Sequence, residues 1–264
     1  MENVERKKLI QKYYAVRAKD YDRQKSRTWK SPVGFGMDVA NELLDALKGF
    51  GGKLVLEVGV GSGRNTLLLL EKVQPWFVGL DLSREILAKA KTKLVFSKHC
   101  VDLVLGDAEH PPFVDAVFDA LICMSTMHYF IFQQEMLIRF SRLLKREGHL
   151  FLGDLTLHES DEAGFLNKME KTISKAHGVY HRPFEIAGML ESCAFWISKM
   201  KTAAYTKSFA ALMEDKGAYF GVKPEALRKC IEEASATEKR LYSVSDEALA
   251  LFYTTAAASK NKHQ

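Results

Sequence analysis

Short apolar runs alternate with helical patterns through the middle of the chain. The runs at 53–58, 77–81, 101–105, 118–123 and 149–155 predict buried strands, because each is short and almost continuously apolar. Between them, apolar residues recur at helical spacing over about 64–73, 84–94 and 132–145. This alternation predicts an α/β fold with a doubly wound, mostly parallel sheet, helices on both faces and right-handed crossovers.

Helical patterns also precede this region. Six residues fall on one stripe of a helix expected from about Glu2 to Asp22, namely Ile10, Tyr13, Tyr14, Arg17, Ala18 and Tyr21. A second helix is expected over 38–48, and the segment 31–36, with its proline and two glycines, predicts a hinge between the two.

The pattern after residue 157 is less regular. We expect a helix over 184–192, a strand over 195–204, a charged helix over 224–233 that begins at a proline, and a last strand over 250–256. About forty residues, 206–246, separate the two strands. They are too many for a plain connection, so we expect a helical insertion near the substrate pocket.

A glycine-rich loop follows the first strand of the alternating region. Glu57 is followed by Gly59, Gly61 and Gly63, which allow positive φ angles and let a ligand approach the backbone. The next helix directs free N–H groups into the same space. Two loops are compatible with such a stretch, the dinucleotide-binding G-x-G-x-x-G and the methyl-donor G-x-G-x-G, and the spacing here is the second.

Acidic residues end the next strands. Asp81 closes the second apolar run, at the separation from the glycines where a carboxylate accepts ribose hydroxyls, and Asp107 follows the third run. Since parallel strands end at one edge of a sheet, Glu57, Asp81, Asp107 and Cys123 are expected to lie together.

The succession E-x-G-x-G-x-G, D and G-D-A resembles the class I S-adenosylmethionine-dependent methyltransferases, of the small-molecule type similar to the quinone-biosynthesis C-methyltransferases. The resemblance covers about residues 38–157. It implies a seven-stranded sheet that closes with an antiparallel pair, and S-adenosylmethionine as cofactor. We therefore expect a helical arm or lid at 1–37 and a methyltransferase domain at 38–258 that contains the insertion at 206–246, followed by a polar, frayed tail at 259–264.

The resemblance implies roles for individual residues. Glu57 and the backbone of Gly59 and Gly61 face the methionyl part, and Gly63 completes the loop. Asp81 binds the ribose, Leu82 the adenine face and Asp107 the adenine amino group with Ala108 beside it, while Cys123 offers its carbonyl.

Candidate acceptor residues are less specific. His128 follows strand 4 and could take a proton from a hydroxyl or an enolic carbon acid, although a structural hydrogen bond is the alternative. Tyr13, Tyr14, Arg17 and Tyr21 suit a lid over a dry site, or ordinary packing. His181, with His177 and Arg182, is a further possible contact. The sequence Cys123-Met124-Ser125-Thr126 lacks the Asn/Asp-Pro-Pro-Tyr/Phe pattern of amino-nitrogen methyltransferases.

Composition and charge indicate which partners and metals the protein could bind. The chain has 264 residues, 47% apolar content and a net charge of +5, of which residues 1–30 carry ten Lys or Arg against four acids. This basic arm is either a solvated helix face or a surface for nucleic acid or an anionic membrane. The four cysteines lack metal-binding spacing, and the residues of a magnesium-dependent catechol enzyme are missing, so no metal is expected.

Three functional hypotheses follow. The first is a cytoplasmic methyltransferase for a small organic acceptor, without a membrane span. The second is an RNA or protein methyltransferase that uses the basic arm, although interspersed acids and the lack of an aromatic-basic motif argue against nucleic acid. The third is a different class, either a nicotinamide-dependent oxidoreductase, which the glycine spacing disfavours, or a catalytically silent nucleoside-binding regulator. The sequence does not predict an oligomeric state.

Overall fold

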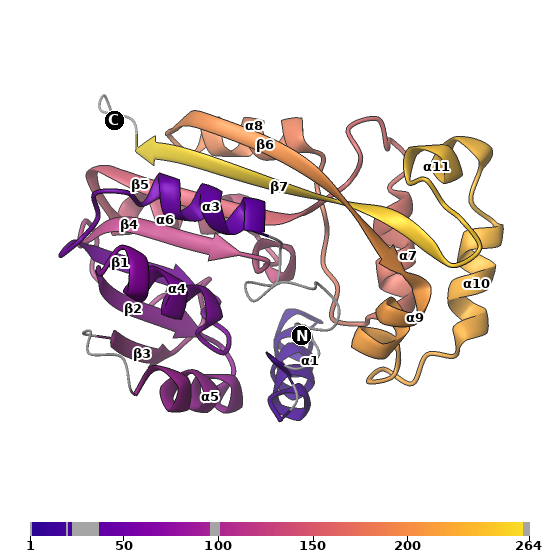
Figure 1. Ribbon diagram of the computed structural model, residues 1–264, viewed down its shortest axis with the longest axis horizontal. Helices are drawn as coiled ribbons and strands as arrows, with labels where there is room; N and C mark the ends of the chain where they lie inside the picture. Colours follow the sequence, from indigo (N-terminus) through magenta and orange to yellow (C-terminus); the bar gives the residue numbers. More distant parts are fainter. Residues whose placement is uncertain (1, 20, 23–36, 96–100, 261–264) are drawn as a thin grey trace.

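The computed structural model describes residues 2–19, 21–22, 37–95 and 101–260. Its centre is a seven-stranded sheet in the order β3-β2-β1-β4-β5-β7-β6 (Figure 1). The strands are β1 (Leu54–Val58), β2 (Trp76–Asp81), β3 (Val101–Leu105), β4 (Phe118–Met124), β5 (Leu144–Thr156), β6 (Phe195–Ser208) and β7 (Ala248–Lys260).

Strand pairing confirms the doubly wound arrangement. The five strands from β3 to β5 pair in parallel, and β7 lies antiparallel to both β5 and β6. Because β1 pairs with β2 on one side and β4 on the other, the chain reverses its winding direction beside β1. Open α/β sheets bind ligands at such a reversal, beyond the carboxyl ends of the strands.

Helices cover both faces of the sheet. On one face, α3 (Met37–Ala46), α4 (Arg64–Lys72) and α5 (Arg84–Leu94) pack in a core that includes Val55. On the other, α6 (Gln133–Leu143) and α8 (Pro183–Ser192) pack in a core that includes Leu56. Successive residues of β1 therefore point into cores on opposite faces of the sheet. Because both faces are buried, the strand is continuously apolar and does not alternate between apolar and polar residues.

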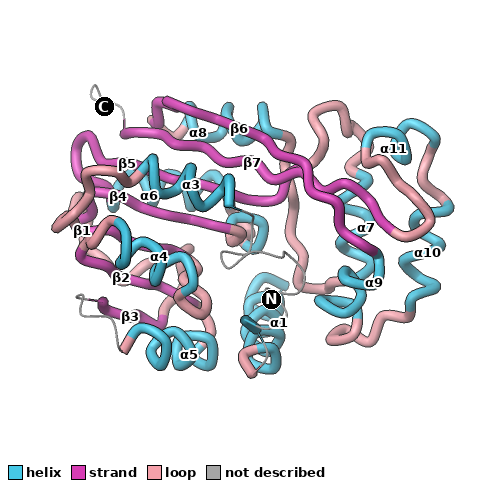
Figure 2. The backbone as a smooth tube through the Cα atoms, in the orientation of Figure 1, coloured by secondary structure: helices cyan, strands magenta, loops and turns pink. Residues whose placement is uncertain are grey.

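A third core lies beyond the edge of these two layers. It is formed by α7 (Phe165–Ile173) and by residues 209–247, which together we call the cap. Residues 209–247 contain α9 (Phe209–Leu212), a π-helical turn (Met213–Gly217), α10 (Pro224–Glu232) and α11 (Ala236–Leu241). Figure 2 shows the cap around the far ends of β6 and β7, which reach past the rest of the sheet. The first helix, α1 (Glu2–Arg17), lies between the cap and the sheet (Figure 1).

The predicted boundaries differ from the structure in a few places. Strand 5 begins at Leu144 rather than 149, because Leu144 pairs with Phe118 across a register shift. The first helix ends at Arg17 rather than Asp22, and α7 was not predicted. Since β6 stays paired as far as Ser208, the inserted helices begin at 209 rather than 206.

The tail expected over 259–264 is also corrected. Ser259 pairs with His149, and Lys260 pairs with Phe195, so both belong to β7. The expected hinge at 31–36 and residues 261–264 lie outside the described residues. Within the described part of the chain, no helix combines the length and apolar content needed to cross a membrane.

Candidate active site at the carboxyl ends of the strands

A cavity of about 170 Å³ lies where the sheet reverses its winding, between the strand ends, α1 and the cap. Four chain segments that leave β1 to β4 contribute to its wall: 59–62, 80–83, 106–109 and 124–126. The sheet topology thus brings Gly59 and Thr126, 67 positions apart in the chain, to the same cavity.

The glycine-rich loop has the backbone that its sequence predicts. Gly59, Gly61 and Gly63 have φ angles of +73°, +57° and +75°. A Cβ atom at Gly59 would collide with the side chain of Thr126, and one at Gly63 would lie 2.9 Å from Leu94 Cδ1. Gly59 and Gly61 border the cavity, whereas Gly63 does not, because it packs α4 against α5.

Asp81 borders the cavity and is held by backbone amides. Gly61 N donates to one carboxylate oxygen at 2.9 Å, and Ser83 N donates to the other at 2.9 Å. Burial raises the pKa of Asp81 in spite of these hydrogen bonds. Each oxygen retains capacity for a further donor. Leu82 also lines the wall.

Asp107 and Ala108 border the cavity as well, but Asp107 already has a partner. Lys7 Nζ lies 2.6 Å from Asp107 Oδ2 and also pairs with Glu109. Glu109 further accepts hydrogen bonds from Ile131 N at 2.8 Å and Phe132 N at 3.1 Å. Burial would raise the pKa of Glu109, but the hydrogen bonds from Lys7 and these amides lower it.

Two of the residues expected to contact the cofactor do not line the cavity. Glu57 is 1% exposed and does not line the cavity; its oxygens accept from Thr66 Oγ1 at 2.7 Å and Asn65 Nδ2 at 3.2 Å. Asn65 is the residue that reaches the wall, and burial raises the pKa of Glu57 to about 7. Cys123 is likewise enclosed, because β4 continues to Met124, and the wall is formed by Met124, Ser125 and Thr126.

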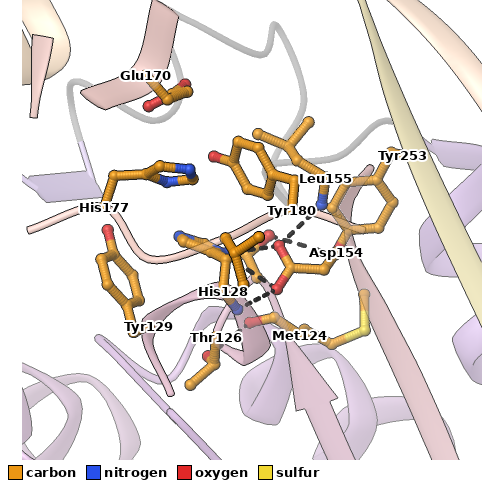
Figure 3. A network of polar contacts seen from close by, with 12 residues as sticks. Met124, Thr126, His128, Tyr129, Asp154, Leu155, Glu170, His177, Tyr180 and Tyr253 are labelled. Carbon is orange, nitrogen blue, oxygen red and sulfur yellow. Dashed lines mark hydrogen bonds and ion pairs between the residues drawn. The ribbon is translucent and has the colours of Figure 1, made fainter. Parts of the chain in front are cut away.

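His128 lies at the cavity with a carboxylate behind it (Figure 3). Its Nδ1 atom is 2.8 and 3.0 Å from the two oxygens of Asp154, and its backbone N–H donates to Asp154 Oδ2 at 3.0 Å. His128 and Asp154 are 6% and 3% exposed. A carboxylate on Nδ1 favours the tautomer with a proton there, which leaves Nε2 as an acceptor.

Sequence reasoning did not identify Asp154. The available signal was its position near the carboxyl end of strand 5, because Asp81 closes β2 and Asp107 follows β3. The carboxylate is fixed by a further hydrogen bond from Leu155 N at 2.8 Å.

The aromatic stripe of the first helix covers the cavity. Tyr13, Tyr14, Arg17 and Tyr21 all line it. Arg17 donates to the Tyr13 hydroxyl, and its guanidinium carbon lies 4.9 and 5.5 Å from the ring centroids of Tyr13 and Tyr21. Tyr14 donates to the Tyr129 hydroxyl at 3.0 Å. The stripe is therefore turned inward, toward the strand ends.

The other candidate histidines lie outside the wall. His181 Nδ1 is 4.0 Å from Glu185 at the start of α8, and His177 Nε2 is 2.9 Å from Asn167 Oδ1. The wall is completed instead by residues that the sequence did not indicate: Glu170, Tyr180, Lys207, Lys216 and Leu251. Charged residues in a helix or edge strand are normally exposed, so their pattern gives no signal of this position.

Comparisons with known proteins agree with this geometry. A family model described as "Methyltransferase domain" matches residues 56–152. Over 108 residues, the chain is 35% identical to phthiotriol/phenolphthiotriol dimycocerosates methyltransferase 1 of Mycobacterium ulcerans, which covers 39% of this chain and 38% of that protein. Over 147 residues, it is 28% identical to demethylmenaquinone methyltransferase of Thermotoga maritima, covering 54% and 62%.

A solved structure extends the likeness beyond that segment. The YcgJ protein from Bacillus subtilis superimposes with a TM-score of 0.74 at 18% identity, over 86% of this chain and 99% of that one, and so shares the fold. The matching segment spans less than two thirds of either curated relative's length. Residues 56–152 therefore match a methyltransferase domain, and the chain beyond them shares the fold of the YcgJ protein.

Proposed function

We propose that the protein transfers a methyl group from S-adenosylmethionine to a small organic acceptor. The observation that carries this proposal is the cavity itself, where the glycine loop and Asp81 meet the buried His128–Asp154 pair beneath α1. One enclosed space thus adjoins both a nucleoside-type site and a group able to hold a proton.

The residues present fit the cofactor. Asp81 keeps acceptor capacity for two ribose hydroxyls, and Leu82 offers an apolar surface for the adenine ring. Gly61 has a φ angle of +57°, which favours glycine, whereas an added Cβ would make only an ordinary contact with the Tyr21 hydroxyl at 3.9 Å. Asn65, fixed by Glu57, and the backbone of Gly59 would hold the methionyl part. When bound, the cofactor supplies a methyl group already activated by its sulfonium.

The protein's own contribution is positioning, exclusion of water and control of one proton. Tyr13 and Tyr14 of α1, with Tyr21 beyond the end of that helix, cover the cavity, which keeps water from the donor. Asp154 orients His128 so that Nε2 can accept a proton from an acceptor hydroxyl or an acidic C–H, and the carboxylate stabilises the imidazolium that forms.

A small acceptor suits this site better than a polymer. Lys7 and Arg17 of the basic arm face inward, toward Asp107 and Tyr13, and Arg6 donates to Tyr129 O at 2.8 Å. These charges therefore hold α1 in place instead of forming an outward surface. The names of the two relatives, a dimycocerosates and a demethylmenaquinone methyltransferase, also support an organic acceptor. We further propose a cytoplasmic location, which the free Cys123, Cys193 and Cys230 suit.

The test combines binding with turnover. Calorimetry should show binding of S-adenosylhomocysteine and none of NADH. Label from methyl-labelled S-adenosylmethionine should then enter the small-molecule fraction of a cell extract. Label in the RNA or protein fraction would favour the second hypothesis, and binding without label in any fraction would favour the silent regulator. An Asp81→Ala variant, which removes the ribose acceptor, is the matched control for both measurements.

A further inference from the structure

One side of α1 spans the ends of two neighbouring strands. Lys7 and Gln11 are one helical turn apart, so their side chains lie on the same side of the helix. Lys7 Nζ lies 2.6 Å from Asp107, which follows β3. Gln11 Nε2 donates to the backbone oxygen of Leu82, which follows β2, at 3.2 Å. Because β2 and β3 pair in parallel, this side of α1 covers the space beyond their carboxyl ends (Figure 1).

The adenine ring of the cofactor is expected in that space. Asp81 keeps acceptor capacity for the ribose, and Leu82, the next residue, offers an apolar surface for the base. A base attached to that ribose extends toward the residues after β3. Gln11 and Asp107 both line the cavity there.

The hydrogen bond to Leu82 fixes the orientation of the Gln11 amide. A backbone carbonyl oxygen only accepts hydrogen bonds, so the NH2 group of Gln11 must face it. A half-turn of the amide would instead place two oxygens against each other. The end of the amide away from Leu82 is therefore Oε1, which can only accept. Within the part of the chain that the structure describes, Oε1 accepts no hydrogen bond.

Asp107, the other acceptor expected for the adenine amino group, is already engaged. Its Oδ2 atom pairs with Lys7, and its Oδ1 atom accepts from Glu109 N at 2.9 Å. A carboxylate oxygen can accept more than one hydrogen bond, so Asp107 can still take one N–H of the amino group. The second N–H needs another acceptor, and Gln11 Oε1 is available for it.

We infer that Gln11 is a specificity-determining residue for the base of the cofactor, because its Oε1 atom accepts a hydrogen bond from the adenine amino group. This inference rests on the proposed function and adds to its cofactor site a residue of the covering helix. Hypoxanthine carries an oxygen in place of the amino group and would set two acceptors against each other here. A site that is built to pair with a donor rejects a ligand that lacks it.

Calorimetry with two ligands tests the inference. The ligands are S-adenosylhomocysteine and its deaminated analogue, S-inosylhomocysteine, which differ only in the base. We expect the unaltered protein to bind the first roughly tenfold more tightly, or more. Gln11→Met keeps the length of the side chain without its hydrogen-bonding groups, and should lower this ratio about three- to tenfold through weaker binding of S-adenosylhomocysteine. Lys12→Met, at an exposed position that does not line the cavity, should leave the ratio unchanged.

The ratio separates recognition of the base from a merely structural role. If Gln11 only tethers α1 to Leu82, Gln11→Met weakens both ligands equally, and a constant ratio overturns the inference. Equal binding of the two ligands by the unaltered protein overturns it as well, while leaving the proposed function intact. Absence of S-adenosylhomocysteine binding contradicts the proposed function itself.

A third ligand isolates the amino group. The analogue of S-adenosylhomocysteine with hydrogen in place of that group lacks the donor and adds no acceptor. Its loss of affinity relative to S-adenosylhomocysteine should be about three- to tenfold larger in the unaltered protein than in Gln11→Met. Equal losses in the two proteins would show that Gln11 does not bind the amino group. Since Gln11 is exposed, the melting temperature of the unliganded variant should match that of the unaltered protein.

Discussion

Lys7 on α1 and Asp107 at the end of β3, one hundred positions apart in the chain, are joined by a 2.6 Å ion pair. The same ammonium group pairs with Glu109, so one cation of the covering helix balances two carboxylates at the edge of the cavity. The segment over the site is thus held by a charge contact on the side where we expect the adenine.

Removal of this ion pair should weaken cofactor retention. In Lys7→Met, we expect the dissociation constant of S-adenosylhomocysteine to rise roughly three- to tenfold, since a partly exposed pair contributes on the order of 1 kcal/mol. Calorimetry measures this change, and Lys8→Met, on the exposed side of α1, should have no effect. Tighter binding by Lys7→Met would show instead that Lys7 competes with the cofactor for Asp107.

Asp154→Asn should slow turnover without loosening the cofactor. The backbone N–H groups of His128 and Leu155 bond to different oxygens of Asp154, so the single amide oxygen keeps only one of these hydrogen bonds, and the amide no longer fixes the proton on Nδ1. A decrease in kcat of about 10²-fold is expected, at the lower end of general acid–base effects. His128→Asn should lower kcat at least as much. Melting temperature and S-adenosylhomocysteine affinity serve as controls, and normal turnover in both variants would assign the pair a purely structural role.

Gly178→Ala should displace α1. An added Cβ would collide with the Arg6 guanidinium, which can move, and with the backbone oxygen of His128, which cannot move freely. We expect a loss of about 1–3 kcal/mol in the free energy of unfolding, as for overpacked sites, together with weaker cofactor binding.

The matched control is Gly188→Ala. Gly188 lies inside α8 with open space around its Cα, so alanine should leave binding unchanged and stabilise the protein by about 0.5–1 kcal/mol through helix propensity. Urea unfolding of both variants gives the comparison. Equal stability of the two alanine variants would mean that α1 does not press on Gly178.

The buried Glu57 predicts a pH-dependent stability. Its pKa, 4.5 in the exposed state, is raised by burial to about 7 in the folded protein. The folded state therefore binds the proton more tightly, and this stabilisation is fully present below pH 4.5 and is lost as the pH rises through about 7. The pKa difference corresponds to roughly 3 kcal/mol.

Glu57→Gln isolates that effect from other titrating groups. Between pH 5 and pH 8.5, the free energy of unfolding of the unaltered protein should fall relative to the Gln variant by up to about 3 kcal/mol. Urea denaturation at the two pH values, without cofactor, measures the difference. A constant difference between the two proteins would show that Glu57 is ionised throughout this range.

The cofactor half of the site was predictable because its signals are local. A glycine that needs a positive φ angle, such as Gly61, and a carboxylate that closes an apolar run, such as Asp81, are both visible within a few residues. The predicted wall of the cavity was wrong where a strand ended one residue later than expected. The extension of β4 by a single position to Met124 moved the wall from Cys123 to the next residues.

The acceptor half was not predictable in the same way. Lys207 and Glu170 become buried, and Lys216 partly buried, because the cap packs on α1 and on the ends of β6 and β7, and no local pattern encodes that packing. The helix α7 did have a signal, since Phe165, Leu166, Met169 and Ile173 recur at helical spacing. Glu170 is buried beside that stripe, but nothing in the sequence around it predicts that a glutamate lies inside the protein.

Strands β6 and β7 form a long antiparallel hairpin whose tip can vary in length without changing the sheet. Its ladder extends from the pair Phe195–Lys260 to the pair Ser208–Ala248, and the inserted helices of the cap form the tip of this hairpin. A lengthened or shortened tip leaves the strand register unchanged, because insertions at a hairpin end add loop and not ladder. The family model ends at residue 152, before all of these elements. Acceptor selectivity can therefore change by exchange of the tip alone, while the residues around the methyl donor keep their positions.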